Sequence, residues 1–254
     1  MRAVVAAVAV ALLAAAGSAA AEKAAPRPLP LLEPCVTKAE RRGIVRFRAP
    51  DRTRLIGVML GSGPNVVVLA HQGGGGAPGD LCAWIPYARQ LRAAGYRVLV
   101  FDHRAHGSSG VPSAVPRYTA VDLDVVGAVR LARARGARRV VLGGASLGGA
   151  AVIGGAARLT KPVDGVFTVG GTHSFGVVDV MGSLRRLTVP LLFVAAENDA
   201  GGQFAQEARQ MSDASISPSK QLAVFPGAAH GAPQLRNRGP RRLVDSWIRS
   251  RFSP

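Results

Sequence analysis

The sequence has 254 residues, a length that fits one α/β domain and leaves little room for a second folded domain. The formal net charge is +17, from 32 Lys and Arg residues against 15 Asp and Glu residues. The arginines are scattered and lack interleaved aromatic residues or a nucleic-acid motif, so we do not expect DNA or RNA binding. Two interpretations of the charge stay open: contact with anionic surfaces, such as phospholipid headgroups or acidic polymers, and a general codon bias towards arginine.

The first 21 residues have the parts of a secretory signal peptide. Arg2 gives a positive start, residues 3–17 form a small apolar run, and Ala19, Ala20 and Ala21 form a cleavage site. We therefore expect a secreted or extracytoplasmic mature protein with no transmembrane anchor after cleavage. A retained membrane anchor or a buried helix is the alternative. Residues 22–42, which begin with closely spaced prolines, are expected to form an extended leader.

The chain contains two cysteines, Cys35 and Cys82. Export would place both in an oxidising compartment, where a Cys35–Cys82 disulfide is expected. Two buried free thiols are the alternative. Neither cysteine has a Cys or His neighbour at metal-ligand spacing, so the sequence predicts no metal site.

From Gly43 onward, strand-like and helix-like segments alternate without internal repeats. Residues 65–70 are apolar at nearly every position, which is typical of a strand buried on both faces. Such alternation predicts an α/β fold for residues 43–254, with a mostly parallel sheet and helices on both faces. The expected strands are 43–48 and 54–60, which could pair as a hairpin, and then 65–70, 97–101, 139–143, 163–170, 189–196 and 221–225. The expected helices are 81–94, 120–135, 147–159, 204–211 and 241–252.

A nucleophile motif lies between the strand at 139–143 and the helix that follows it. Residues 144–148 have the sequence GASLG, with Ser146 at the centre. A serine in such a turn between strand and helix adopts a strained conformation and needs small neighbours, which Gly144 and Gly148 provide. The pattern predicts that Ser146 is a nucleophile; a glycine-rich helix N-terminus without chemistry is the alternative.

A serine nucleophile requires a base and a carboxylate that orients the base. Asp199 follows the strand at 189–196, and His230 follows the strand at 221–225, so the chain order is Ser, Asp, His. His230 is the one histidine in the position of the base, although a surface-loop histidine would have the same sequence. Glu197 and Asp179 are alternative acids, and Asp199 is favoured because a carboxylate on the strand itself would point away from the His230 loop.

The oxyanion of an acyl-transfer intermediate needs two N–H donors. Leu147, directly after the nucleophile, is expected to supply one, and the loop after the strand at 65–70 the other. In that loop Gly73 is the first choice and Gln72 the second. His71 is expected to anchor the loop through hydrogen bonds.

Three segments resemble the α/β-hydrolase superfamily. They are residues 67–74 (VVLAHQGG), 95–109 (GYRVLVFDHRAHGSS) and 144–149 (GASLGG). The resemblance implies an acyl-enzyme mechanism without a cofactor, with Ser146, His230 and Asp199 as nucleophile, base and acid. It also implies that Asp102 and Arg104 are structural. The family usually has glycine where this chain has Gln72, which leaves the second oxyanion donor open.

The segment at 171–188 is too short for a folded cap domain, so the resemblance is to compact esterases, thioesterases and dienelactone-hydrolase-like members. His173 and Phe175 in this segment could line the site or serve in loop packing. The sequence therefore predicts a monomeric or weakly associating hydrolase for small-molecule or polymeric esters. A peptidase, amidase or thioesterase with the same triad is the first alternative. A non-catalytic, basic envelope-binding protein that has kept the fold is the second.

Overall fold

The computed structural model describes residues 34–74, 79–112 and 119–253. In these residues, eight strands form one sheet in the order β1-β2-β4-β3-β5-β6-β7-β8. The β1-β2 and β2-β4 pairs are antiparallel, and the other neighbouring pairs are parallel. The mostly parallel α/β sheet that the sequence predicts is confirmed. The signal peptide expected at 1–21 lies outside the described residues.

The elements follow the predicted order with small shifts at their ends. The strands are β1 (Ile44–Arg48), β2 (Arg54–Leu60), β3 (Asn65–Ala70), β4 (Arg97–Phe101), β5 (Arg139–Ala145), β6 (Gly165–Val169), β7 (Leu191–Ala196) and β8 (Lys220–Phe225). The helices are α1 (Ile85–Ala93), α2 (Val121–Ala134), α3 (Leu147–Ala157), α4 (Val180–Leu184), α5 (Gln203–Ala214) and α6 (Arg238–Phe252). Short 3₁₀ turns occur at η1 (Glu40–Gly43), η2 (Leu81–Ala83), η4 (Asp199–Gly202) and η5 (Ala232–Arg236).

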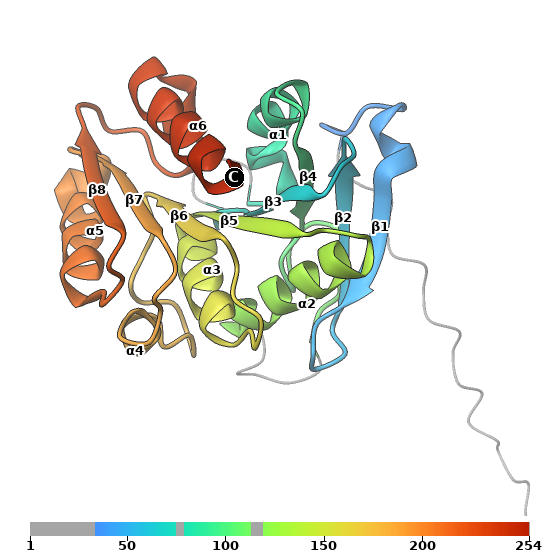
Figure 1. Cartoon of the computed structure of the whole chain (residues 1–254), viewed down its shortest axis with the longest axis horizontal. Coiled ribbons are helices and arrows are strands. Elements are labelled where there is room, and N and C mark those ends of the chain that lie inside the picture. The colour runs from blue at the N-terminus through green and yellow to red at the C-terminus, as the bar shows by residue number, and fades with distance from the viewer. Residues whose placement is uncertain (1–33, 75–78, 113–118, 254) are drawn as a thin grey trace, which may run out of the picture.

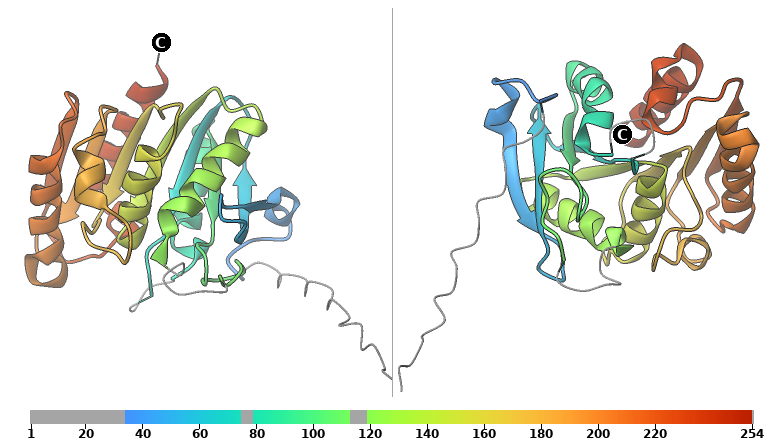
Figure 2. Two further views of the ribbon diagram at one scale, coloured as in Figure 1. Left: turned by 90° about the horizontal axis from the view of Figure 1, so that it is seen from below. Right: turned by 180° about the vertical axis from the view of Figure 1, so that it is seen from behind.

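Strand β3 is buried on both faces, as its continuous apolar sequence predicts. Val66 and Val68 face the core formed with α2 and α3, whereas Val67 and Leu69 face the core formed with α1 and α6. Successive side chains of a strand point to opposite faces, so both faces need a helical cover. Helices α1 and α6 cover one face, and α2, α3, α4 and α5 cover the other (Figures 1 and 2).

The helix predicted at 81–94 begins with a separate turn. Residues Leu81–Ala83 form η2, and α1 starts at Ile85. Pro86 lacks the N–H that would continue the helical hydrogen bonds back to Cys82, which explains the break. Trp84 at the junction is fully buried and donates from Nε1 to the carbonyl oxygen of Ala70, 2.8 Å away. The turn before α1 is thus attached to the end of β3.

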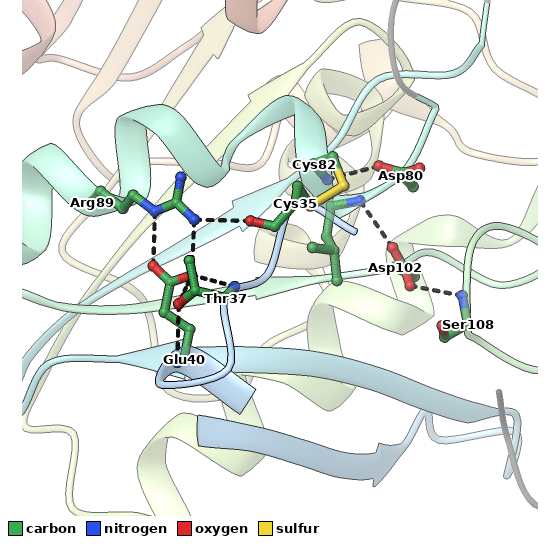
Figure 3. The surroundings of a disulfide bond; sticks show 9 residues. Cys35, Thr37, Glu40, Asp80, Cys82, Arg89, Asp102 and Ser108 are labelled. Atoms are coloured by element: carbon green, nitrogen blue, oxygen red, sulfur yellow. Dashed lines mark hydrogen bonds and ion pairs between the residues drawn. A yellow bond between two sulfur atoms is a disulfide. The ribbon is translucent and has the colours of Figure 1, made fainter. Parts of the chain in front are cut away.

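The described part of the expected leader, residues 34–42, packs onto the fold beside α1. Cys35 forms a disulfide with Cys82 of η2, across 47 positions of sequence (Figure 3). The side chain of Val36 is buried, and Glu40 pairs with Arg89 of α1 at 2.8 Å. The packed structure therefore begins before Gly43, at which the sequence places the start of the domain.

The order of the strands brings two loops together at one end of the sheet. β3 lies between β4 and β5, and the β3-β5 register pairs Ala70 with Gly144. The segment after Ala70 and the segment after Gly144 therefore leave the sheet side by side. Ligands of parallel sheets bind beyond the carboxyl ends of the strands, where the strand order reverses. None of the helices in the described residues is long and apolar enough to cross a membrane.

Candidate active site

Ser146 occupies a strained turn between β5 and α3. Its backbone has φ 50° and ψ −119°, values that non-glycine residues adopt rarely. The glycines around it are required for close packing. A Cβ at Gly148 would collide with the carbonyl oxygens of Ala70 and His71, and a Cβ at Gly144 would collide with the carbonyl oxygen of Gly148. The turn thus has the geometry that the GASLG motif predicts.

Backbone hydrogen bonds hold this turn from three sides. The N–H of Ser146 donates to the carbonyl oxygen of Val169, at the end of β6. Its own carbonyl oxygen accepts from the N–H groups of Gly149 and Thr172, at 2.8 and 3.3 Å. The strained conformation is therefore fixed by the end of β6, by the first turn of α3 and by the loop after β6.

The structure brings His230 and Asp199 into contact. Nδ1 of His230 lies 3.0 and 2.8 Å from the two carboxylate oxygens of Asp199. The His230 side chain is 34% exposed, whereas that of Asp199 is 2% exposed. The ring of Phe204 packs against the imidazole with a centroid distance of 4.2 Å. With Nδ1–H donating to the carboxylate, Nε2 is the nitrogen that can accept a proton.

The two alternative acids lie elsewhere. Glu197 is exposed at the end of β7. Asp179 caps α4, where its Oδ1 accepts from the N–H of Gly182 at 2.8 Å. Oδ2 of the same carboxylate lies 3.9 Å from Nη1 of Arg186. Asp199 is thus the acid that the fold places beside His230.

The loop after β8 that carries His230, here called the histidine loop, lies next to the turn that carries Ser146. A Cβ at Gly231 would lie 3.4 Å from Cβ of Ala145 and would overlap the side chain of Gln72. The residue after His230 therefore packs against the residue before Ser146. The side chain of Gln72 also accepts a hydrogen bond at Oε1 from the N–H of Ala232, at 2.9 Å.

The expected oxyanion donors lie near one another. A Cβ at Gly73 would lie 2.9 Å from Cδ2 of Leu147, so the loop after β3 faces the first turn of α3. The first N–H groups of a helix have no partner within the helix, which leaves the Leu147 N–H free of the helical hydrogen-bond pattern. The structure therefore places Gly73, and with it the adjacent Gln72, close to the start of α3.

His71 anchors the loop, as expected. Its Nδ1 lies 2.6 Å from the carbonyl oxygen of Gln72, and its Nε2 accepts from the N–H of His103 at 2.9 Å. Complete burial lowers the pKa of His71 well below its ordinary value, and the nearby His103 lowers it further. A neutral imidazole with both nitrogens engaged serves as a structural link between β3 and β4.

Asp102 and Arg104 are structural, as the resemblance implies. Oδ1 of Asp102 accepts from the N–H of Leu81, and Oδ2 accepts from the N–H of Ser108, both at 2.8 Å (Figure 3). The fully buried guanidinium of Arg104 pairs with Asp124 and Asp51, each at 2.8 Å. Both side chains hold the loop after β4.

The sequence does not single out Glu207, which orders the loop after β6. Its Oε2 accepts from the N–H of His173 at 2.9 Å, and its Oε1 accepts from Gln203 at 2.8 Å. Burial raises the pKa of Glu207, but the hydrogen bonds from the side chains of Thr172 and Gln203 and from the His173 N–H lower it overall. Phe175 in this loop packs against the core, which supports loop packing as its role. Glu207 lies among the apolar positions of α5 that face the core, and an acidic residue at such a position is the sequence signal that could have identified it.

No group of three or more His, Cys, Asp or Glu side chains in the described residues could hold a metal ion.

Comparisons with known proteins agree with this architecture. A family model described as the alpha/beta hydrolase fold matches residues 65–185, from β3 to the end of α4. An esterase from Pyrococcus furiosus superposes with a TM-score of 0.67 and 18% identity, covering 83% of this chain and 90% of the esterase. An esterase from a Rhodococcus species gives 0.64 and 18%, covering 82% and 99%.

A thermophilic esterase from Thermogutta terrifontis gives a TM-score of 0.63 and 19% identity, covering 83% of this chain and 99% of the esterase. No curated protein matches the sequence significantly. At these identities the structural matches establish the fold. None of the described segments forms a large cap, and α4 is the one helix between β6 and β7. The chain is therefore a compact protein of the α/β-hydrolase fold, similar in architecture to esterases of that fold.

Proposed function

We propose that this protein is an exported serine hydrolase that cleaves carboxylic esters, with Ser146 as nucleophile, His230 as base and Asp199 as orienting acid. The observation that carries the proposal is the combination of a strained serine turn with a buried carboxylate bonded to a partly exposed histidine in an adjacent loop. The three residues follow β5, β7 and β8, so the same end of the sheet presents them. The fold and the esterase-like architecture support a hydrolase.

The reaction begins when Nε2 of His230 removes the proton from Oγ of Ser146 as the oxygen attacks the ester carbonyl. The tetrahedral oxyanion accepts hydrogen bonds from the N–H of Leu147 and from that of Gly73 or Gln72. His230 then gives its proton to the departing alcohol, which leaves an acyl group on Ser146. A water molecule, activated by the same imidazole, releases the carboxylic acid and regenerates the serine.

Asp199 has a positional and electrostatic role. Its carboxylate fixes the imidazole in the tautomer that carries hydrogen on Nδ1 and stabilises the imidazolium that forms during each proton transfer. Its near-complete burial strengthens this interaction, because fewer water molecules screen it.

The disulfide supports an extracytoplasmic location. Disulfides persist in oxidising compartments, and Cys35 and Cys82 are the two cysteines of the whole sequence. The net charge of +17 adds contact with anionic lipid or polymer to the proposal.

A matched substrate panel tests the function. The purified mature protein is given a nitrophenyl ester, a thioester and an aminoacyl anilide that share one acyl group, and kcat/KM is measured for each. We expect the ester to have the highest kcat/KM and Ser146→Ala to lose it. A higher kcat/KM for the anilide would identify a peptidase or amidase, and a higher value for the thioester would identify a thioesterase. No turnover of any of the three would favour a binding protein.

A further inference from the structure

Gln72 connects the loop of the expected oxyanion donors with the loop that carries His230. It lies in the loop after β3, beside the expected oxyanion donors, and its side chain is buried. Its Oε1 accepts a hydrogen bond of 2.9 Å from the N–H of Ala232, which is 160 positions away in sequence. Ala232 follows His230 by two residues. One side-chain amide therefore spans from the oxyanion loop to the histidine loop.

The backbone of Gln72, from which this side chain extends, is held in place by hydrogen bonds. The carbonyl oxygen of Gln72 lies 2.6 Å from Nδ1 of His71, and Nε2 of the same imidazole accepts from the N–H of His103 at 2.9 Å. All three residues are buried. The Gln72 backbone is thus fixed to the ends of β3 and β4, and its side chain extends from a fixed point.

The histidine loop is held by a hydrogen bond on either side of His230. Before it, the carbonyl oxygen of Gly227 accepts from the N–H of Asn198 at 2.8 Å. After it, the N–H of Ala232 donates to Gln72. Residues 226–228 are exposed, so the first half of the loop gains little from packing. Gly231 has φ +62°, and any Cβ on it would overlap the Gln72 amide. The backbone of the loop is therefore shaped around the Gln72 side chain.

We propose that Gln72 is a positioning residue whose side-chain amide keeps His230 in place relative to Ser146 and the oxyanion donors. This inference rests on the proposed function. A displacement of about 1 Å at a reacting group can lower a rate by about 100-fold, which makes one hydrogen bond at this place matter.

Gln72→Met tests the proposal, because it keeps the length of the side chain and removes the amide. We expect kcat for the ester to fall by about 10- to 100-fold while KM changes by less than about threefold. Gln221→Met on β8 makes the same chemical change at an exposed position and should leave kcat unaltered.

A second background separates positioning of His230 from general weakening of the fold. In His230→Ala, the residual rate no longer depends on the imidazole, so Gln72→Met should lower it by less than about threefold. Equal losses of kcat from Gln72→Met in both backgrounds would overturn the proposal, as would a lowered melting temperature with kcat unchanged.

A measurement without substrate keeps the inference separate from the proposed function. The downfield proton resonance of the His230 Nδ1–H, which donates to Asp199, should broaden or disappear in Gln72→Met and persist in Gln221→Met. An unchanged resonance in Gln72→Met would contradict positioning by Gln72. A broadened resonance in a protein that hydrolyses no ester would support the positioning role and refute the ester hydrolase.

Discussion

Nδ1 of His230 lies 2.8 Å from Oδ2 of Asp199, and the carboxylate is buried while the imidazole is one-third exposed. A buried anion beside a solvent-accessible base fits a residue pair in which the acid orients and the histidine reacts. Because Asp199 lies in the turn directly after β7, the position of the pair is set by the sheet.

Replacement of Asp199 by Asn should lower kcat by about 10³- to 10⁴-fold, because an amide favours the wrong imidazole tautomer. Asp179→Asn and Glu197→Gln should change kcat by less than about threefold, since neither side chain contacts His230. Steady-state ester hydrolysis by the three variants, with circular dichroism to verify folding, measures the difference. A large loss in Asp179→Asn with a small one in Asp199→Asn would reassign the acid.

Gly170 should tolerate no side chain beside this pair. It has φ +54°, and a Cβ there would lie 2.9 to 3.1 Å from Nε2 of Gln234, Oδ2 of Asp199 and the N–H nitrogen of Gly231. Gly170→Ala should lower the free energy of unfolding by about 1 to 3 kcal/mol and also lower kcat, because the pair must shift.

Gly136→Ala is the matched control for Gly170→Ala. Gly136 has φ +84° but open space around it, so it carries the backbone strain without the crowding. Urea unfolding and ester hydrolysis of both variants separate the two effects. Equal losses in kcat for the two variants would show that Gly170 does not crowd the site.

The disulfide should stabilise the protein by tying residues 34–42 to η2, directly before α1. Closure of a loop across 47 positions contributes about 3 to 4 kcal/mol in the chain-entropy model. The Cys35→Ser, Cys82→Ser double variant should therefore unfold at lower urea concentration, while kcat of the folded enzyme stays the same. Two titratable thiols in the denatured, unreduced wild type would disprove the bond.

Low pH should weaken the attachment of residues 34–42 to α1, because this attachment includes the pair between Glu40 and Arg89. The hydrogen bonds from Arg89 lower the pKa of the Glu40 carboxyl from 4.5 to about 2. A carboxyl with a depressed pKa in the folded state stabilises the protein above its ordinary pKa, and this stabilisation is lost as the pH falls from about 4.5 towards 2. The loss should be about 1 to 3 kcal/mol, reduced by the partial exposure of Arg89.

The difference in free energy of unfolding between wild type and Glu40→Gln should accordingly shrink over that pH range. Chemical denaturation at a series of pH values provides the measurement. A constant difference between pH 6 and pH 2 would mean that Glu40 does not stabilise the fold through its charge.

The sequence predicts much of this site because chemistry in a parallel sheet lies at strand ends. Ser146, Asp199 and His230 each follow an apolar run, so the positions of the strands identify them. The same reasoning cannot find the bond between Gln72 and Ala232, because a contact across 160 positions depends on how two loops pack. Nothing in the local sequence marks it.

Other differences between the sequence-based predictions and the structure also depend on tertiary packing. The packing of residues 34–42 depends on the disulfide and on the Glu40–Arg89 pair, which a proline-rich composition does not indicate. The 3₁₀ turn η5 depends on Gly231 and Pro233, which shape the chain after His230 within the packed loop. Glu207 acts on the backbone of His173, a contact between α5 and the loop after β6.

Active-site labelling can identify the nucleophilic serine. The mature protein is treated with a fluorophosphonate probe, and the modified peptide is located by mass spectrometry. We expect one probe per molecule on Ser146 and no labelling of Ser146→Ala. Ser174→Ala, which removes an exposed serine in the loop after β6, should be labelled fully. Undiminished labelling of Ser146→Ala, or a probe attached to another serine of the wild type, would contradict Ser146 as the nucleophile.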